Sequence, residues 1–98
     1  MDSYSGTGQG TDLNGLIERC AAGDHSALRE IFDSEAGRMK AVALRVLNRN
    51  DLADDALQDA FVQVWQNAGR FRPGPASPRA WLYTIVRFRA IDLLRSRA

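Results

Sequence analysis

Arginines and aromatic residues alternate in the C-terminal third of the chain, a combination suited to binding nucleic acid. The segment contains Arg70, Phe71, Arg72, Arg79, Trp81, Tyr83, Arg87, Phe88, Arg89, Arg95 and Arg97. Guanidinium groups neutralise phosphates, and aromatic rings stack on unpaired bases of any sequence. Trp81, Thr84, Phe88 and Asp92 share one face at helical spacing, so this face could meet bases while flanking arginines hold phosphates. The alternative is that Trp81 and Phe88 are core residues and that the arginines lie at the surface.

A second group of residues is suited to binding a protein. Asp55, Gln58, Asp59 and Val62 lie three or four positions apart, so a helix would project them together. A face that combines carboxylates with an amide and an uncovered valine suits docking on a basic partner. Without further context, a solvated helix face is the simpler interpretation.

The residue types argue against catalysis. The chain has one histidine and one cysteine, and no arrangement of serine, histidine and aspartate indicates a nucleophile. The glycines of residues 6–10 do not follow a strand, so we expect no phosphate loop there. Cys20 and His25 would need ligands from elsewhere to hold a metal. We therefore expect no enzyme, no cofactor and no metal site.

Four segments with apolar residues three and four positions apart predict an all-α fold that presents these groups. The predicted helices cover about 12–22, 25–47, 52–67 and 78 to the end. Asp12, Asp24 and Asp51 are expected N-caps, and Ser77 is expected to cap the last helix with Pro78 at its first position. The segment 69–76 contains Pro-Gly-Pro and predicts a non-helical connection.

Length and charge limit the organisation of the chain. Its 98 residues, 45% of them hydrophobic, predict one domain over 12–98 and a disordered polar tail over 1–11. The chain shows neither a signal peptide nor an apolar run long enough for a membrane, and a single cysteine suits the reducing cytoplasm. Residues 1–60 carry a balance of −5 and residues 61–98 a balance of +6. This asymmetry indicates two partners of opposite charge, one of them a nucleic acid.

Several motifs together resemble extracytoplasmic function (ECF) sigma factors. The run LADDALQDAFVQVW at 52–65 is similar to the second conserved region of that family. Phe71-Arg72, the run RAWLY at 79–83, Arg87 and the run AIDLLR at 90–95 follow in the order of its promoter-melting segment. The resemblance covers roughly residues 13–97 and implies a compact bundle of four helices of the sigma region 2 type.

The resemblance implies a role for each charged segment. The acidic helix is expected to bind the clamp helices of the largest subunit of core RNA polymerase through Asp55, Gln58 and Asp59, with Val62 on the same face. The loop and last helix are expected to recognise and melt the promoter −10 element, with a base of the non-template strand flipped into a loop-lined pocket. The residues expected to contact DNA are Arg70, Phe71, Arg72, Ser77, Arg79, Trp81, Tyr83, Thr84, Arg87, Phe88, Asp92 and Arg95. An anti-sigma factor is also an expected partner.

Three features depart from the family pattern. Phe88 stands where the family commonly has Asn and cannot make the base contacts of an amide, so stacking or apolar contact would replace them. Pro78 and the Pro-Gly-Pro run change the base-capturing loop.

Since ECF sigma factors also have a C-terminal helix-turn-helix domain that reads the −35 element, we expect these residues to be one domain of a longer protein.

Two other functions are compatible with parts of the pattern. A helical adaptor or anti-sigma-like regulator would use the acidic helix alone and would not bind DNA. A repressor fragment that binds duplex DNA would need a short turn before its recognition helix, whereas the connection here is long and rich in proline.

Overall fold

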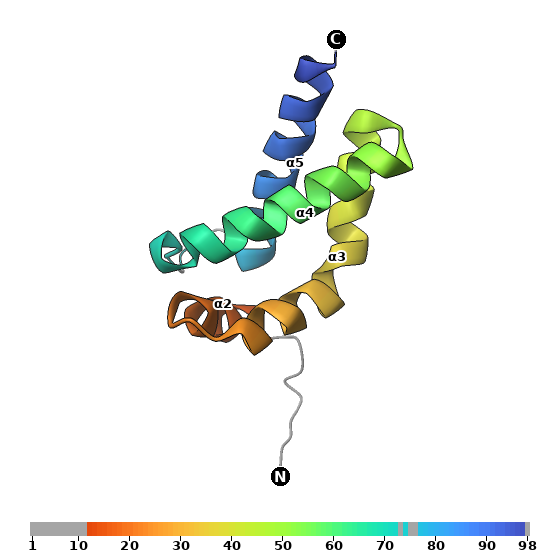
Figure 1. Ribbon diagram of the computed structural model, residues 1–98. Helices are drawn as coiled ribbons and strands as arrows, with labels where there is room; N and C mark the ends of the chain where they lie inside the picture. Colours follow the sequence, from red (N-terminus) through yellow and green to blue (C-terminus); the bar gives the residue numbers. More distant parts are fainter. Residues whose placement is uncertain (1–11, 73, 75–76, 98) are drawn as a thin grey trace.

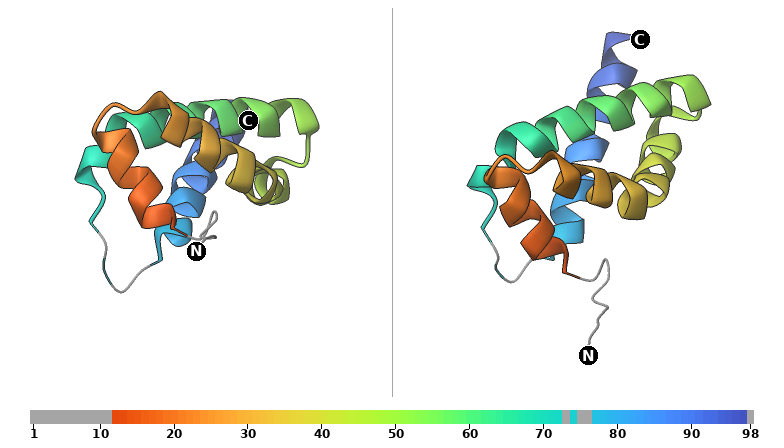
Figure 2. Two further views of the ribbon diagram at one scale, coloured as in Figure 1. Left: turned by 90° about the horizontal axis from the view of Figure 1, so that it is seen from below. Right: turned by 60° about the horizontal axis from the view of Figure 1, so that its bottom comes forward.

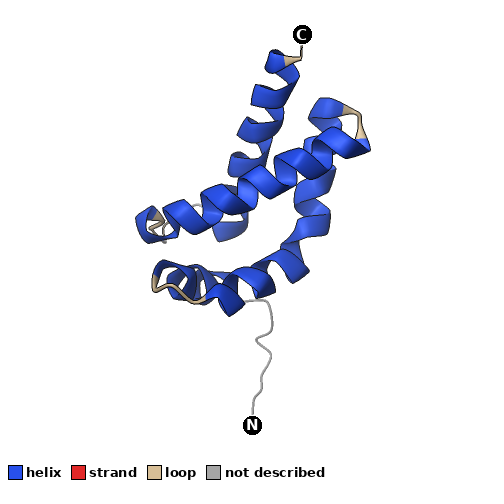
Figure 3. Cartoon of the chain, viewed as in Figure 1, coloured by secondary structure: helices blue, strands red, loops and turns tan. Residues whose placement is uncertain are grey.

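The computed structural model describes residues 12–72, 74 and 77–97, which are almost entirely helical (Figures 1 and 3). They form α2 (Leu13–Ala21), α3 (His25–Leu47), α4 (Asn50–Asn67), the short 3-10 helix η1 (Ala68–Arg70) and α5 (Pro78–Ser96). None of the described residues belongs to a strand. The prediction of an all-α bundle of four helices is confirmed. The predicted tail, residues 1–11, lies outside the described residues.

Three of the four predicted N-caps are confirmed. Asp12 accepts a hydrogen bond from the Gly15 N–H at 3.1 Å, and Asp24 accepts one from the Ser26 N–H at 2.9 Å. Ser77 Oγ accepts one from the Ala80 N–H at 3.0 Å, with Pro78 at the first helical position. Each bond satisfies one of the backbone donors that a helix start leaves without a partner.

The predicted cap at Asp51 is wrong. Helix α4 begins at Asn50, its N-cap is Arg49, and none of the described side chains caps it. The reason is the tight reversal that precedes it: Asn48 ends α3 in the left-handed conformation, with φ 56°, so α4 begins almost at once. Asp51 then lies in the first turn, near the positive end of the helix, and pairs with Arg49.

The core lies where α3, α4 and α5 pack against one another. Helix α4 crosses in front of α5, and the last turns of α5 extend beyond it (Figure 1). Most of the predicted apolar stripe of α4 is buried, whereas Trp65 is half-buried. The largest fully buried side chains are Ile17, Ile31, Glu35, Met39, Val64, Leu82 and Val86.

Helix α2 supports the beginning of the connection between α4 and α5. It packs against α3 and also against η1, which lies beside it in both views of Figure 2. The chain reverses between α2 and α3 at Gly23, whose φ of +93° favours glycine. Arg19 then donates to Asp24 at 2.9 Å across this joint. The base of the loop is thereby held by residues far from it in the sequence.

Candidate functional site

The four residues expected to dock on a protein form one surface of α4, here called the docking face. Asp55, Gln58 and Val62 are exposed, and Asp59 is partly exposed. Val62 leaves 54% of its surface in contact with solvent although it is apolar. A single exposed valine is common on protein surfaces, so Val62 alone does not separate an interface from a solvated helix face.

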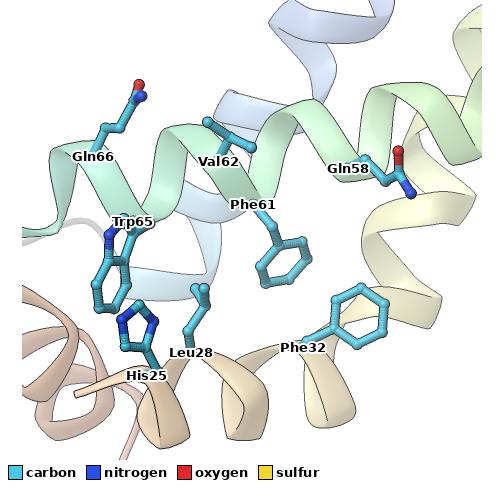
Figure 4. A pocket seen from close by; sticks show the side chains of 8 residues that line it. All are labelled: His25, Leu28, Phe32, Gln58, Phe61, Val62, Trp65 and Gln66. Atoms are coloured by element: carbon cyan, nitrogen blue, oxygen red, sulfur yellow. The ribbon is translucent and has the colours of Figure 1, made fainter. Parts of the chain in front are cut away.

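An apolar groove continues the docking face toward α3, as Figure 4 shows. Its cavity has a volume of about 480 Å³ and is lined by His25, Leu28, Phe32, Gln58, Phe61, Val62, Trp65 and Gln66. Two aromatic contacts shape it: His25 stacks on Trp65 at 4.3 Å between ring centroids, and Phe32 meets Phe61 at 5.0 Å. The groove gives an apolar segment of a partner a place to bind beside the carboxylates.

Sequence reasoning missed the residues that α3 contributes to this groove. Phe32 lies at helical spacing from the apolar residues Leu28 and Ile31, yet it is 40% exposed because it lies at the edge between α3 and α4. His25 gave no signal, since its stacking partner is Trp65 on another helix. One feature of the sequence could have indicated that Phe32 lines a groove. Phe32 and Phe61 are aromatic residues on two separate amphipathic helices, and such residues can meet at the edge where the helices pack.

The described residues between α4 and α5, together with the first turns of α5, line a second cavity, here called the loop pocket. It has a volume of about 390 Å³ and is lined by Arg70, Phe71, Arg72, Gly74, Ser77, Ala80, Trp81 and Thr84. Six of the residues expected to contact DNA therefore meet in one place: Arg70, Phe71, Arg72, Ser77, Trp81 and Thr84. The rings of Phe71 and Trp81 lie 4.9 Å apart at 43°, and both side chains are half-buried. An aromatic wall with arginines at its edge suits an unpaired base and its phosphates.

Several polar groups of the loop pocket already have partners within the chain. Arg72 Nη1 donates to the Gly69 and Phe71 carbonyl oxygens at 2.8 and 3.0 Å. Thr84 Oγ1 donates to the Ala80 carbonyl at 2.9 Å, and the Ser77 hydroxyl caps α5. These bonds hold Arg72, Thr84 and Ser77 against the backbone that lines the pocket.

The remaining residues expected to contact DNA lie outside the loop pocket. Tyr83 and Arg79 line a different cavity, of about 410 Å³, beside Leu13. Arg87, Phe88 and Arg95 lie farther along α5, and Phe88 is 61% exposed. An exposed phenylalanine on the face of Trp81 and Thr84 is not a core residue. The core interpretation is therefore wrong for Phe88 and only half correct for Trp81.

Two arginines of α5 form ion pairs with other parts of the chain. Arg79 binds the buried carboxylate of Glu35, and this hydrogen bonding raises the pKa of Arg79. Arg89 lies between Asp59 of the docking face, at 3.5 Å, and Asp92, at 3.3 Å. Both aspartates were expected to meet partners, and the structure gives them this shared internal contact.

The described residues offer no group of three or more histidine, cysteine or acidic side chains that could hold a metal ion. Burial raises the pKa of the Cys20 thiol, which favours the unreactive protonated form. Across residues 12–72, 74 and 77–97, every helix is too short or too polar to cross a bilayer.

Comparison with known proteins gives a consistent set of relatives. The family model described as Sigma-70 region 2 matches residues 31–98. The ECF RNA polymerase sigma factor SigK of Mycobacterium sp. strain KMS is 36% identical over 86 residues, which are 88% of this chain and 45% of that protein. The ECF RNA polymerase sigma factor SigK of Mycobacterium tuberculosis strain H37Rv is 33% identical over 85 residues, 87% of this chain and 46% of that protein. The chain thus spans about half the length of these relatives.

Proposed function

Since this chain belongs to the sigma-70 region 2 family and is an ECF sigma factor domain, we propose that it binds core RNA polymerase and the promoter −10 element through two separate surfaces. The docking face and the apolar groove bind the clamp helices of the largest polymerase subunit. The loop pocket and the exposed face of α5 bind the melted non-template strand. In this function the domain supplies binding energy and carries out no catalysis of its own, and it acts in the cytoplasm where the chromosome lies.

The loop pocket is the observation that carries the DNA-binding part of the proposal. Phe71 and Trp81 come together from the loop and from α5, with Arg70 and Arg72 beside them. A base flipped out of the duplex loses a few kcal/mol of stacking, and new stacking on an aromatic side chain offsets much of this loss. Arg87 and Arg95, both exposed farther along α5, are then placed to follow the backbone of the strand.

At Phe88, helix α5 has an apolar side chain for contact with bases, where relatives commonly have the amide of Asn. Its ring is exposed on the same face as Trp81 and Thr84, about two turns farther along α5. It can stack on a base or contact a thymine methyl group, but it cannot hydrogen-bond to a base edge. The preferred −10 sequence should therefore differ at this position from that of relatives with Asn.

The polymerase-binding part of the proposal depends on charge and apolar surface together. Asp55 and Asp59 are complementary to a basic partner and would steer it, while Val62 and the apolar groove would hold it. An anti-sigma factor that occupies the same groove would block polymerase, and this is the partner that we propose for the inactive state.

A pair of binding measurements tests the proposal. A fragment with the polymerase clamp helices should bind the chain, and reversal of charge at Asp55 and Asp59 should weaken that binding. Single-stranded DNA should bind in preference to duplex, with an affinity that falls steeply as salt rises. If the clamp fragment binds and single-stranded DNA does not, the chain is instead a protein-binding adaptor. Clamp binding that survives the charge reversal would contradict the docking face.

A further inference from the structure

Glu35 is a carboxylate buried in the middle of α3. Only 1% of its surface is exposed, and no other charged residue in the described part of the chain is buried. Removing a carboxylate from water is unfavourable unless hydrogen bonds replace its hydration. The position of Glu35 between the buried residues Ile31 and Met39 therefore requires a partner that satisfies both of its oxygens.

Arg79 is that partner, 44 residues away in the sequence. Its Nε lies 3.0 Å from Oε1 and 3.2 Å from Oε2 of Glu35, and its Nη2 lies 2.9 Å from Oε2. A planar guanidinium that binds both carboxylate oxygens fixes an orientation as well as a distance. The pair thus ties the first turn of α5 to the middle of α3.

The anchored turn carries part of the loop pocket. Ser77, Ala80 and Trp81 line the pocket, and Arg79 lies between them in the sequence but points to Glu35. Trp81 is only half-buried, so packing alone constrains it less than it constrains Leu82. A rotation of this first turn would move Trp81 away from Phe71.

Arg79 differs in this respect from the other arginines expected to contact phosphate. Arg70, Arg87 and Arg95 form no ion pair with a carboxylate among the described residues, and all three are exposed. The charge of Arg79 is balanced by Glu35 at 2.9 Å, and two of its three guanidinium nitrogens are engaged. Arg79 therefore has less unpaired charge and fewer free hydrogen-bond donors for a DNA phosphate than the other three arginines have.

We propose that Glu35 and Arg79 are a positioning pair, through which Arg79 holds Trp81 in the base-binding geometry instead of contacting phosphate. The inference depends on the proposed function, since it assigns the pair to the DNA-binding surface. It replaces the direct DNA contact that the sequence motif suggested for Arg79. Glu35, which no sequence motif singled out, becomes a determinant of base binding although it cannot touch DNA.

The test compares Glu35→Gln and Arg79→Lys with the unchanged chain. The probe is a single DNA strand selected by the unchanged chain from a randomised pool, together with copies that carry an abasic residue at each position in turn. Affinity is measured across a series of salt concentrations. The fold of each variant is checked by thermal unfolding and by binding of the clamp fragment.

A positioning pair predicts a loss of affinity without a loss of phosphate contacts. Both variants should bind the selected strand about tenfold more weakly, which is within the range for loss of one stacked base, with an unchanged salt dependence. The preference for the intact strand over the most damaging abasic copy should fall by a similar factor. Arg87→Gln is the matched control. It should instead make the fall of log K, the logarithm of the binding constant, with log salt less steep by about 0.7, because one phosphate contact is lost. Its preference for the intact strand over the abasic copy should not change.

Three outcomes would contradict the inference. If Glu35→Gln binds as tightly as the unchanged chain, the pair does not position the pocket. An equal loss for intact and abasic strands would show that the pair only stabilises the fold. Retention of affinity in Arg79→Lys would indicate that Arg79 acts through its charge on phosphate. If the unchanged chain selects no strand at all, the proposed function itself fails, and the role of the pair fails with it.

Discussion

The docking face and the loop pocket are built in different ways. The docking face consists of four residues of a single helix, so local spacing is enough to place Asp55, Gln58, Asp59 and Val62 together. The loop pocket joins η1, the loop and α5, and its supports include α2 and α3. A surface on one helix tolerates shifts of that helix as a whole, whereas a pocket between elements depends on every contact that holds them.

The two surfaces also differ in charge and in the way they are connected. The acidic docking face suits a basic protein partner, and the arginine-rich pocket suits phosphates. Arg89 joins them, because its guanidinium lies between Asp59 of α4 and Asp92 of α5. Its Nε is buried and has no hydrogen-bond partner among the described residues, so the ion pairs are made by the two terminal nitrogens of the guanidinium alone.

Substitution of Arg79 should give the largest effect and tests whether the pocket depends on long-range contacts. Arg79→Met leaves the Glu35 carboxylate buried without its partner, so the free energy of unfolding should fall by about 3 kcal/mol, at the low end for broken buried pairs because Arg79 is 45% exposed. Urea unfolding measures the change. Arg87→Met, at an exposed position on the same helix, is the control and should change stability little. Equal effects of the two substitutions would mean that Glu35 has no special need of Arg79.

Substitution of Trp81 separates the two surfaces through DNA affinity. Trp81→Ala should weaken binding of single-stranded DNA by about 1–3 kcal/mol, because one stacking surface is lost. Binding of the clamp fragment should remain within experimental error, since Trp81 is not part of the docking face or the apolar groove. Fluorescence anisotropy with labelled DNA and labelled clamp fragment measures both. Parallel losses in the two assays would mean that the surfaces are not independent.

Substitution of Val62 makes the reciprocal comparison. Val62→Glu should weaken clamp binding by about 1–2 kcal/mol, because a charge would replace an apolar contact in the interface. Affinity for single-stranded DNA should not change. Leu94→Glu is a matched control, since Leu94 is also an exposed apolar residue, at 47%, but lies near the end of α5. A similar loss of clamp binding in both variants would indicate general electrostatic repulsion, not a specific face.

These differences also explain what could be predicted from the sequence. The caps at Asp12, Asp24 and Ser77 and the apolar stripe of α4 depend on residues a few positions apart, and they were predicted correctly. The Asp51 cap failed because the left-handed Asn48 shortens the turn, and no local pattern distinguishes the two starting points. Glu35 lies four residues from Ile31 and from Met39, so helical spacing alone could predict that it faces the core. Its pairing with Arg79, 44 residues away, could not be predicted from spacing. Contacts between distant helices determine the rest of the site.

A pH titration gives the smallest expected effect and compares the two regions through their tryptophans. The hydrogen bond from the Ser26 hydroxyl, followed by that from Arg19, lowers the pKa of Asp24 from 3.8 to about 2. Because the pKa is lower in the folded state, the stabilisation by Asp24 is present above about pH 4 and is lost as the pH falls toward 2. Asp24 is partly exposed, with 37% of its side chain in contact with solvent, so the effect is small. Asp24→Asn should therefore have a lower Tm than the unchanged chain at about pH 5 and a similar Tm near pH 2.

The position of Asp24 at the start of α3 determines which tryptophan should respond more strongly to its protonation. Asp24 caps α3 directly before His25, whose ring stacks on Trp65 in the apolar groove. Among the described residues, the hydrogen bonds and ion pairs of Asp24 are with Arg19 and Ser26, which do not line the loop pocket. A Trp81→Phe variant, which keeps Trp65, should show a fluorescence change between about pH 4 and 2 that Asp24→Asn removes. A Trp65→Phe variant, which keeps Trp81, should show a smaller change over the same range. If Trp81 responds as strongly as Trp65, the two regions unfold together in acid, and the contrast between a local surface and an assembled pocket does not extend to their stability.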